Sequence, residues 1–313
     1  MKVSGREVHS LAQLAGLMRM LYHPGSGTTD GLFLATQLVM HGRIAESNAL
    51  IHTLQRNASS ASARVYLDHL MAMAGEIGRL PGLAEACSDQ QLLSRLYQTE
   101  GYQFFPGSLR REKLLIIFTT MYNNFQIANI VLYVFLKNIG VSVLFVRDDT
   151  FYVYLRGVKG IGSSFASIVE FVQELVSRNG IDEVFTTGFS SAGYASLLLS
   201  TMIPTRRYTG FSVVADLSDD LPYSAYHTQA EILRRQLPGS GFRNLRDVIA
   251  ERPDGVQRTL YFGAQSPVDV MQATKLAGLP DIDLRRLPDC GHHVIRHLVA
   301  AGTFFGILEQ MLA

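Results

Sequence analysis

The pattern of apolar and polar positions along the chain changes near residue 100. Before that point, apolar residues recur at three- and four-residue spacing, as in amphipathic helices, and no stretch gives a convincing strand pattern. After it, short β-type apolar runs alternate with longer helical stretches. The pattern therefore predicts an all-helical N-terminal segment, residues 1–98, followed by an α/β domain over residues 99–313.

In the N-terminal segment we expect helices over residues 11–21, 32–40 and 44–54, the last two joined by a turn at His41-Gly42-Arg43. The stretch from Leu34 to Ser47 resembles one tetratricopeptide-type hairpin. Such repeats need about three stacked units for stability, so ordinary helices that pack on the next domain are the main interpretation. These helices could also bind a protein partner or mediate self-association.

The second segment holds β-type runs separated by helical stretches. The runs are 113–119, 141–146, 184–187, 211–215, 259–263 and 283–287, and residues 101–105 could add an edge strand. The helical stretches are 125–137, 165–176, 192–201, 226–236, 268–276 and 294–311. Strands that alternate with helices in this way predict a doubly wound, mostly parallel sheet with right-handed crossovers.

A turn rich in glycine and serine joins the run 184–187 to the next helix. A strand–turn–helix with a serine between small residues is typical of a nucleophile elbow, which presents the serine hydroxyl above the sheet. Ser190 has Gly188 two residues before it and Ala192 two residues after it, whereas Ser191 would have the bulky Phe189 at the first of these positions. We therefore take Ser190 as the candidate nucleophile. The alternative is an ordinary turn with capping serines.

A serine nucleophile needs a histidine to take its proton and an acid to orient that histidine. In this kind of sheet the acid and then the histidine should follow the serine in the chain, each at the carboxyl end of a strand. His292 follows the last predicted strand and is favoured over His293, which stands closer to the final helix. Asp269 follows the penultimate strand and is favoured over Asp216, which follows the strand before it.

Two backbone N–H groups should stabilise the oxyanion formed during acyl transfer. One is the N–H of Ser191, directly after the candidate nucleophile. The other is expected in the loop after the first central strand, where Thr120 and Met121 are the candidates. Asn123 in the same loop could add a side-chain donor for a polar substrate.

Taken together, these residues resemble those of the α/β-hydrolases, over approximately residues 100–313. The resemblance rests on the turn around Ser190, on Asp269 after a strand and on His292 before the last helix. It implies a serine hydrolase that cleaves an acyl ester, such as a carboxylesterase or deacylase, through a Ser-His-Asp triad and an acyl-enzyme. The alternatives are an acyltransferase with the same triad and a non-catalytic hydrolase-like scaffold.

The run Leu144–Asp149, with Tyr154–Gly157 after it, also resembles a subgroup of hydrolase-like proteins that often lie near bacterial surface-glycan functions. Arg147 and Asp148 stand at a strand end, where they could contact substrate or form a loop ion pair. The expected lid, residues 217–247, is short, which favours an open site. A small or glycan-linked acyl group is therefore the expected substrate.

Charge, cysteine content and apolar stretches indicate where the protein is found and which partners it does not bind. The net charge of +1 gives no basic surface of the kind that binds nucleic acid. Two cysteines in 313 residues do not suggest a disulfide framework, and the N-terminus has no apolar signal stretch, so we expect a cytoplasmic protein. The longest apolar stretch, residues 128–146, is interrupted by Lys137 and Gly140, so we expect no membrane span.

We also expect no cofactor and no metal. The glycines at 157, 160 and 162 do not have the spacing or the setting of a dinucleotide-binding loop. The histidines at 292, 293 and 297 have no nearby carboxylate that would complete a clear zinc pattern.

Overall fold

The fold is taken from a computed structural model of the chain. The structure describes residues 28–58, 60–98, 100–120, 122–148, 150, 152–216, 244–251 and 254–313. The predicted helices over 11–21 and 226–236, the residue Met121 and most of the expected lid lie outside the described residues.

The described residues group into two compact units. The helical unit takes in residues 1–98, 122–138 and 295–308, and the sheet unit takes in residues 99–121, 139–294 and 309–313, each as far as the structure describes them. The first boundary lies where the sequence pattern changes. Residues 122–138 and 295–308, predicted as part of one continuous α/β domain, group instead with the helical unit.

The helical unit contains an antiparallel hairpin followed by further helices. Its N-terminal helices are α2 (Thr28–Met40), α3 (Ile44–Asn57), α4 (Ala61–Gly78), α5 (Leu83–Ser88) and α6 (Gln90–Leu96), and α7 (Asn129–Ile139) follows later in the chain. The hairpin turn between α2 and α3 uses Gly42 at φ 71°, a left-handed conformation that glycine adopts without strain. Ser60 caps α4 by accepting a hydrogen bond from the N–H of Ala63 at 3.2 Å.

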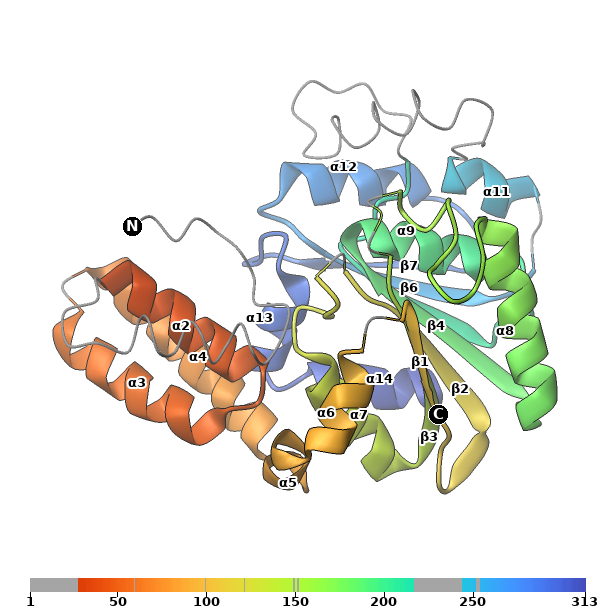
Figure 1. The fold of residues 1–313 in the computed structure, drawn as a ribbon. Helices are drawn as coiled ribbons and strands as arrows, with labels where there is room; N and C mark the ends of the chain where they lie inside the picture. The colour runs from red at the N-terminus through yellow and green to blue at the C-terminus, as the bar shows by residue number, and fades with distance from the viewer. Residues whose placement is uncertain are drawn as a thin grey trace. The chain divides into compact units, whose positions relative to one another are not determined.

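The sheet unit is built on a seven-stranded, mostly parallel sheet, which confirms the predicted fold class (Figure 1). The strands are β1 (Tyr102–Phe105), β2 (Arg110–Phe118), β3 (Val141–Val146), β4 (Glu183–Phe189), β5 (Arg207–Phe211), β6 (Gln257–Gly263) and β7 (Ile282–Leu287). Their order is β1-β3-β2-β4-β5-β6-β7, and β1 is the predicted edge strand, antiparallel to β3. Parallel pairing of the other strands brings their carboxyl ends to one edge of the sheet.

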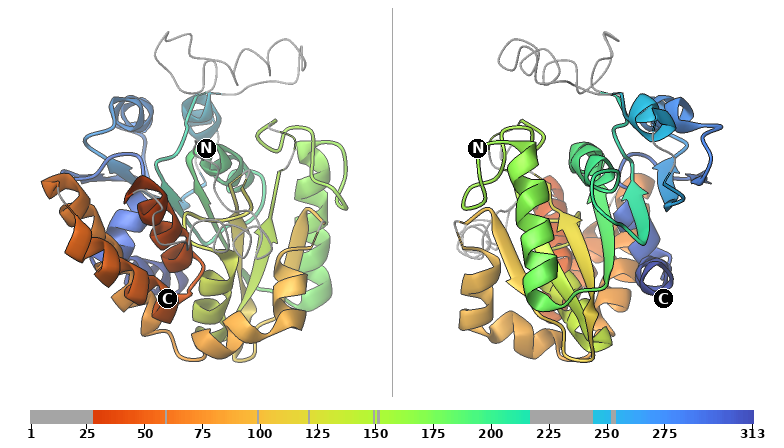
Figure 2. Two further views of the ribbon diagram at one scale, coloured as in Figure 1. Left: turned by 60° about the vertical axis from the view of Figure 1, so that its left-hand side comes forward. Right: turned by 90° about the vertical axis from the view of Figure 1, so that its right-hand side faces the viewer.

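One face of the sheet is covered by helices of the same unit. These are α8 (Phe165–Asn179), α9 (Ser190–Leu199), α11 (Leu245–Glu251) and α12 (Pro267–Leu276), and α8 runs alongside the strands in both views of Figure 2. On β2, Leu114, Ile116 and Phe118 pack into the core with these helices, while Leu115 and Ile117 are buried on the other face. Burial on both faces explains why this strand reads as a continuous apolar run.

Two predicted elements differ from the structure. The strand expected at 211–215 is β5, which runs from Arg207 to Phe211 and ends because Ser212 adopts a left-handed φ of 46°. The helix expected over 294–311 is two helices, α13 (Val294–Ala300) and α14 (Phe304–Leu312). Gly302, at φ 69°, ends α13, and its N–H donates to the carbonyl of Val299.

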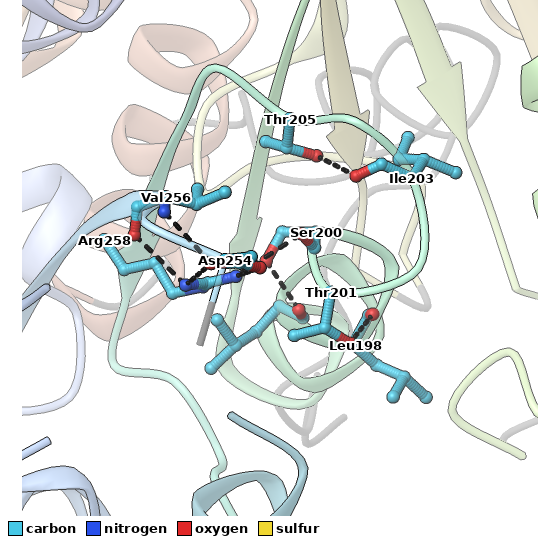
Figure 3. Close-up of polar contacts among 9 residues, drawn as sticks. Leu198, Ser200, Thr201, Ile203, Thr205, Asp254, Val256 and Arg258 are labelled. Carbon is cyan, nitrogen blue, oxygen red and sulfur yellow. Dashed lines mark hydrogen bonds and ion pairs between the residues drawn. The ribbon is translucent and has the colours of Figure 1, made fainter. Parts of the chain in front are cut away.

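An ion pair with a buried arginine lies at the amino end of β6 (Figure 3). The guanidinium of Arg258, whose side chain is 2% exposed, donates to both carboxylate oxygens of Asp254, at 2.9 and 2.6 Å. It also donates to the hydroxyl of Ser200 at 3.3 Å and the carbonyl of Val256 at 3.1 Å. A buried charge needs such partners, because removing one of them leaves it uncompensated.

Burial acts to raise the pKa of Asp254, but hydrogen bonds from Arg258 and Val256 and the charge of Arg258 bring it below its usual value. A carboxyl group whose pKa is lower in the folded than in the unfolded protein adds to the free energy of unfolding at any pH above its unfolded pKa. This added stability is lost as the pH falls through the folded pKa.

We therefore expect Asp254→Asn to lower the free energy of unfolding by about 1–3 kcal/mol at neutral pH. The difference from the wild type should vanish once the carboxyl is protonated, as measured by urea unfolding at neutral and acid pH. Asp283→Asn, which breaks an exposed pair with Arg285, is the control and should change stability by less than about 1 kcal/mol. Equal losses in the two variants would contradict the interpretation that Asp254 compensates a buried guanidinium.

Candidate active site

The turn between β4 and α9 has the geometry of a nucleophile elbow. Ser190 is the first residue of α9 and has φ 56°, in the left-handed region that side chains rarely adopt. A Cβ on Gly188 would lie 2.2 Å from the Oγ of Ser196 and 2.6 Å from the carbonyl oxygen of Ala192, so this position requires glycine. Ala192 itself is buried, which shows that alanine fits at the second small position.

The structure brings Ser190, His292 and Asp269 together in one hydrogen-bonded chain. The Nε2 of His292 lies 3.1 Å from the Oγ of Ser190, and its Nδ1 lies 2.7 Å from the Oδ1 of Asp269. Ser190 follows β4, Asp269 stands in the first turn of α12 after β6, and His292 follows β7. These distances are within hydrogen-bond reach, so the ring could accept the serine proton while the carboxylate holds it in place.

Asp269 is suited to remain a carboxylate. Its side chain is 2% exposed, and burial acts to raise its pKa. The hydrogen bond and charge of His292 outweigh this effect, with help from the hydroxyls of Ser212 and Ser266, so the pKa of Asp269 lies below its usual value. Ser266 also caps α12 by accepting a hydrogen bond from the N–H of Asp269 at 3.3 Å.

The competing acid, Asp216, is engaged elsewhere. Its Oδ2 accepts a hydrogen bond from the Nζ of Lys275 at 2.7 Å. The amide of Gln272 holds the backbone there, since its Oε1 accepts from the N–H of Asp216 and its Nε2 donates to the carbonyl of the same residue. The competing base, His293, is exposed, with its ring centroid 6.0 Å from that of His292. The geometry therefore favours Asp269 and His292 over these alternatives.

Ser212 is a site residue that sequence reasoning missed. It follows β5 directly, and its Oγ donates to the carbonyl oxygen of His292 at 2.9 Å. Its N–H donates to the carbonyl of Tyr261 on the neighbouring strand β6 at 2.7 Å. Through these two bonds Ser212 joins the backbone of His292 to the end of β5 and to β6. The one sequence feature that points to Ser212 is its position at the end of a strand. The predicted strand 211–215 places Ser212 inside the strand instead.

The residues predicted to donate to an oxyanion follow two paired strands, β2 and β4. The pair Phe118↔Gly188 is the last between β2 and β4, so Thr120 and Ser190 are each two residues beyond it. Ser191 is the second residue of α9, and N–H groups in the first turn of a helix have no intrahelical acceptor. Met121, the other candidate, lies outside the described residues.

The predicted substrate contacts have different surroundings. The Oδ1 of Asp148 accepts from the N–H of Thr150 at 2.7 Å, and its Oδ2 accepts from the N–H of Tyr154 at 2.7 Å. Both oxygens of this carboxylate therefore bind the backbone of the segment that follows it. Arg147 is half-buried, and its N–H donates to the carbonyl of Gly101. In the helical unit, Asn123 is buried and its Oδ1 accepts from the amide of Asn129 at 3.1 Å. Contact of Arg147 or Asn123 with substrate stays a prediction.

Cys290, which lies near the site in the sequence, is not a second nucleophile. Cys290 is buried, and burial, with the charge of Asp269, raises the pKa of its thiol to about 11. A thiol that stays protonated is a poor nucleophile.

Within the described ranges, no three histidine, cysteine, aspartate or glutamate side chains gather as metal ligands would. No helix in that part of the chain combines the length and the apolar character needed to cross a bilayer.

Comparison with known proteins identifies the fold. The acylaminoacyl peptidase of Pyrococcus horikoshii matches 67% of this chain and 39% of its own, with a TM-score of 0.50 and 12% identity. MenH from S. aureus matches 69% of this chain and 98% of its own, with a TM-score of 0.48 and 15% identity. Mouse alpha/beta hydrolase domain-containing protein 10 matches 67% of this chain and 92% of its own, with a TM-score of 0.44 and 14% identity.

The match to the peptidase and the strand order of the sheet show that the chain has the α/β-hydrolase fold. No protein-family model matches the sequence, and no curated protein is significantly similar to it. Likeness at this level of identity shows the fold alone.

The left-handed φ of Ser190 should affect how substitutions at this position change the free energy of unfolding. Replacing residue 190 by glycine should give a protein about 1 kcal/mol more stable than replacing it by alanine, because glycine adopts this φ without strain. Both variants lose the hydroxyl, so the comparison isolates the backbone. At Ser191, which is helical, the order should reverse, with glycine less stable than alanine by about 0.5–1 kcal/mol. Urea unfolding of the four variants measures both differences, and the same order at both positions would contradict strain at Ser190.

Proposed function

We propose that the chain is a serine hydrolase that cleaves an acyl ester through an acyl-enzyme. The observation that carries this proposal is the hydrogen-bonded chain from Asp269 through both ring nitrogens of His292 to the Oγ of Ser190. A strained serine at a strand-to-helix turn, with a base and an acid in this order, is the arrangement used for acyl transfer. Several structural neighbours are named as hydrolases or carboxylesterases, and the proposed reaction belongs to the same class.

In the proposed reaction the Oγ of Ser190 attacks the acyl carbonyl carbon, and its proton passes to the Nε2 of His292. The electron pair of the carbonyl bond moves to oxygen, where the N–H groups of Ser191 and of Thr120 or Met121 donate to it. The imidazolium returns its proton to the leaving alkoxide as the ester bond breaks, which leaves the acyl group on Ser190. Water then attacks the acyl-enzyme by the same proton path, while Asp269 stays charged and orients the ring.

Two other functions would use the same fold. In an acyltransferase an alcohol would replace water in the second step, and adding acceptor alcohols during turnover would reveal an ester product. In a non-catalytic scaffold the helices of residues 1–98 would bind a partner, but the close Ser190–His292–Asp269 geometry favours catalysis. A small or glycan-linked acyl substrate and a cytoplasmic location stay predictions, and free Cys87 and Cys290 are consistent with the latter.

A fluorophosphonate probe tests the nucleophile directly. Wild-type protein should be labelled on Ser190, and Ser190→Ala should lose labelling and lower ester turnover by a factor on the order of 10⁶. Ser191→Ala is the matched control, because it removes the neighbouring hydroxyl but keeps the backbone N–H expected at the oxyanion. Labelling that persists in Ser190→Ala would exclude this serine, and a wild type that neither labels nor turns over ester would favour the scaffold.

The acid is tested by two aspartate variants. Asp269→Asn should keep the shape of the side chain but favour the wrong histidine tautomer, so kcat should fall by about 10⁴-fold. Asp216→Asn should disrupt the pair with Lys275 and lower stability, yet leave kcat close to that of the wild type. Steady-state kinetics and urea unfolding of both variants separate the two effects. A large loss of kcat in Asp216→Asn alone would move the acid to that position.

A further inference from the structure

Tyr154 lies buried beneath the loop that is expected to supply the second oxyanion donor. Its side chain packs edge-on against Phe118, the last residue of β2, with ring centroids 4.8 Å apart. Its hydroxyl donates a hydrogen bond of 2.5 Å to the carbonyl oxygen of Thr119. A residue 35 positions along the chain thus binds the first peptide group after β2.

The hydroxyl proton is directed to Thr119 because the other nearby acceptor is occupied. The carbonyl oxygen of Val146 lies 3.1 Å from the same hydroxyl, but it already accepts from the N–H and the Oγ1 of Thr119, at 2.9 and 3.1 Å. Burial, and then the charge of Asp148, raises the pKa of Tyr154 well above its usual range. The hydroxyl therefore stays protonated, and a donor, at neutral pH.

The carbonyl of Thr119 and the N–H of Thr120 belong to one peptide group. The described residues contain no cis peptide bond, so this N–H points away from the carbonyl oxygen that Tyr154 holds. Thr120 lies two residues after Phe118, which is paired with Gly188, and Ser190 lies two residues after Gly188. A hydrogen bond to the carbonyl both fixes the plane of a peptide group and polarises its N–H.

The segment that carries Tyr154 is strained, and a buried carboxylate holds it in place. Val153 and Tyr154 have φ values of 52° and 65°, although a left-handed conformation is unfavourable for residues with a Cβ, and most of all for β-branched valine. Asp148 accepts the N–H of Tyr154 through one oxygen and binds Thr150 through the other. Strain held by such contacts is typical of segments that position a functional group.

We propose that Tyr154, held by Asp148, is a positioning residue that sets and polarises the Thr119–Thr120 peptide as an oxyanion donor. This inference rests on the proposed serine hydrolase function. Tyr154 does not touch the reacting atoms, and its effect passes through the N–H of Thr120. Its hydroxyl should therefore matter more when the oxyanion is present than when substrate is only bound.

The test compares Tyr154→Phe with the wild type, using p-nitrophenyl acetate as substrate and phenylboronic acid as a probe that forms a tetrahedral anion on the serine. Exhaustive titration with fluorophosphonate counts competent sites, so that kcat refers to folded enzyme. We expect kcat to fall about 10-fold and the boronic acid to bind about 10-fold more weakly, with KM changed by less than about 2-fold.

Tyr208→Phe is the matched control, because Tyr208 is also fully buried and its hydroxyl donates to a backbone carbonyl, that of Gly193, at 3.2 Å. It should leave the kcat per site and the affinity for the boronic acid unchanged. If Tyr154→Phe does not fold, Asp148→Asn takes its place, and kcat and the affinity for the boronic acid should fall together by about 3-fold at unchanged KM.

The outcomes separate this inference from the proposed function. If the wild type labels and turns over ester, but Tyr154→Phe or its substitute keeps wild-type kcat and boronic acid affinity, the role of Tyr154 is wrong and the hydrolase stands. The same follows if Tyr208→Phe loses as much as Tyr154→Phe. If the wild type neither labels nor turns over ester, the proposed function is wrong, and this inference is wrong with it.

Discussion

The site depends on one backbone constraint, the left-handed turn at Ser190. A side chain at the end of a parallel strand normally points to one face of the sheet, among the core residues. The turn at φ 56° begins α9 at the serine itself, and Gly188 lets the helix approach the strand too closely for any Cβ. The serine Oγ can then reach the ring of His292, which comes from the far end of the chain. A less strained turn would leave the histidine without a partner.

Parallel pairing explains why three distant residues meet. β4, β6 and β7 end at the same edge of the sheet, so the residues that follow them are brought together although Ser190 and His292 are separated by 102 positions. Open α/β sheets bind their ligands at this edge for the same reason. The opposite edge carries a different kind of polar group. There the buried guanidinium of Arg258 forms an ion pair and two hydrogen bonds with the more exposed carboxylate of Asp254.

The residues that bear the chemistry could be predicted because they obey a chain order. Ser190, Asp269 and His292 each follow a strand, and the order serine, acid, histidine limits the alternatives to a few positions. The supporting residues could not be predicted in this way. Ser212 and Tyr154 act through hydrogen bonds to the backbone of distant residues, and a backbone acceptor leaves no mark on the sequence. Predicting Ser212 also requires the end of β5. The apolar run 211–215 misplaces that end, because Val213, Val214 and Ala215 are buried although they lie outside the strand.

Left-handed residues other than glycine include Val153 and Tyr154 in the segment after β3, Ser190 after β4 and Ser212 after β5. Each conformation is unfavourable by itself, so each must be held by contacts made elsewhere in the fold. Asp148 holds the first pair, the close packing at Gly188 accompanies the second, and bonds to Tyr261 and His292 hold the third. Ser190 and Ser212 stand at the edge where the polar side chains converge, whereas Asp281, at φ 60°, directly precedes β7 at the opposite edge. Strain at Ser190 and Ser212 is what a preorganised site requires.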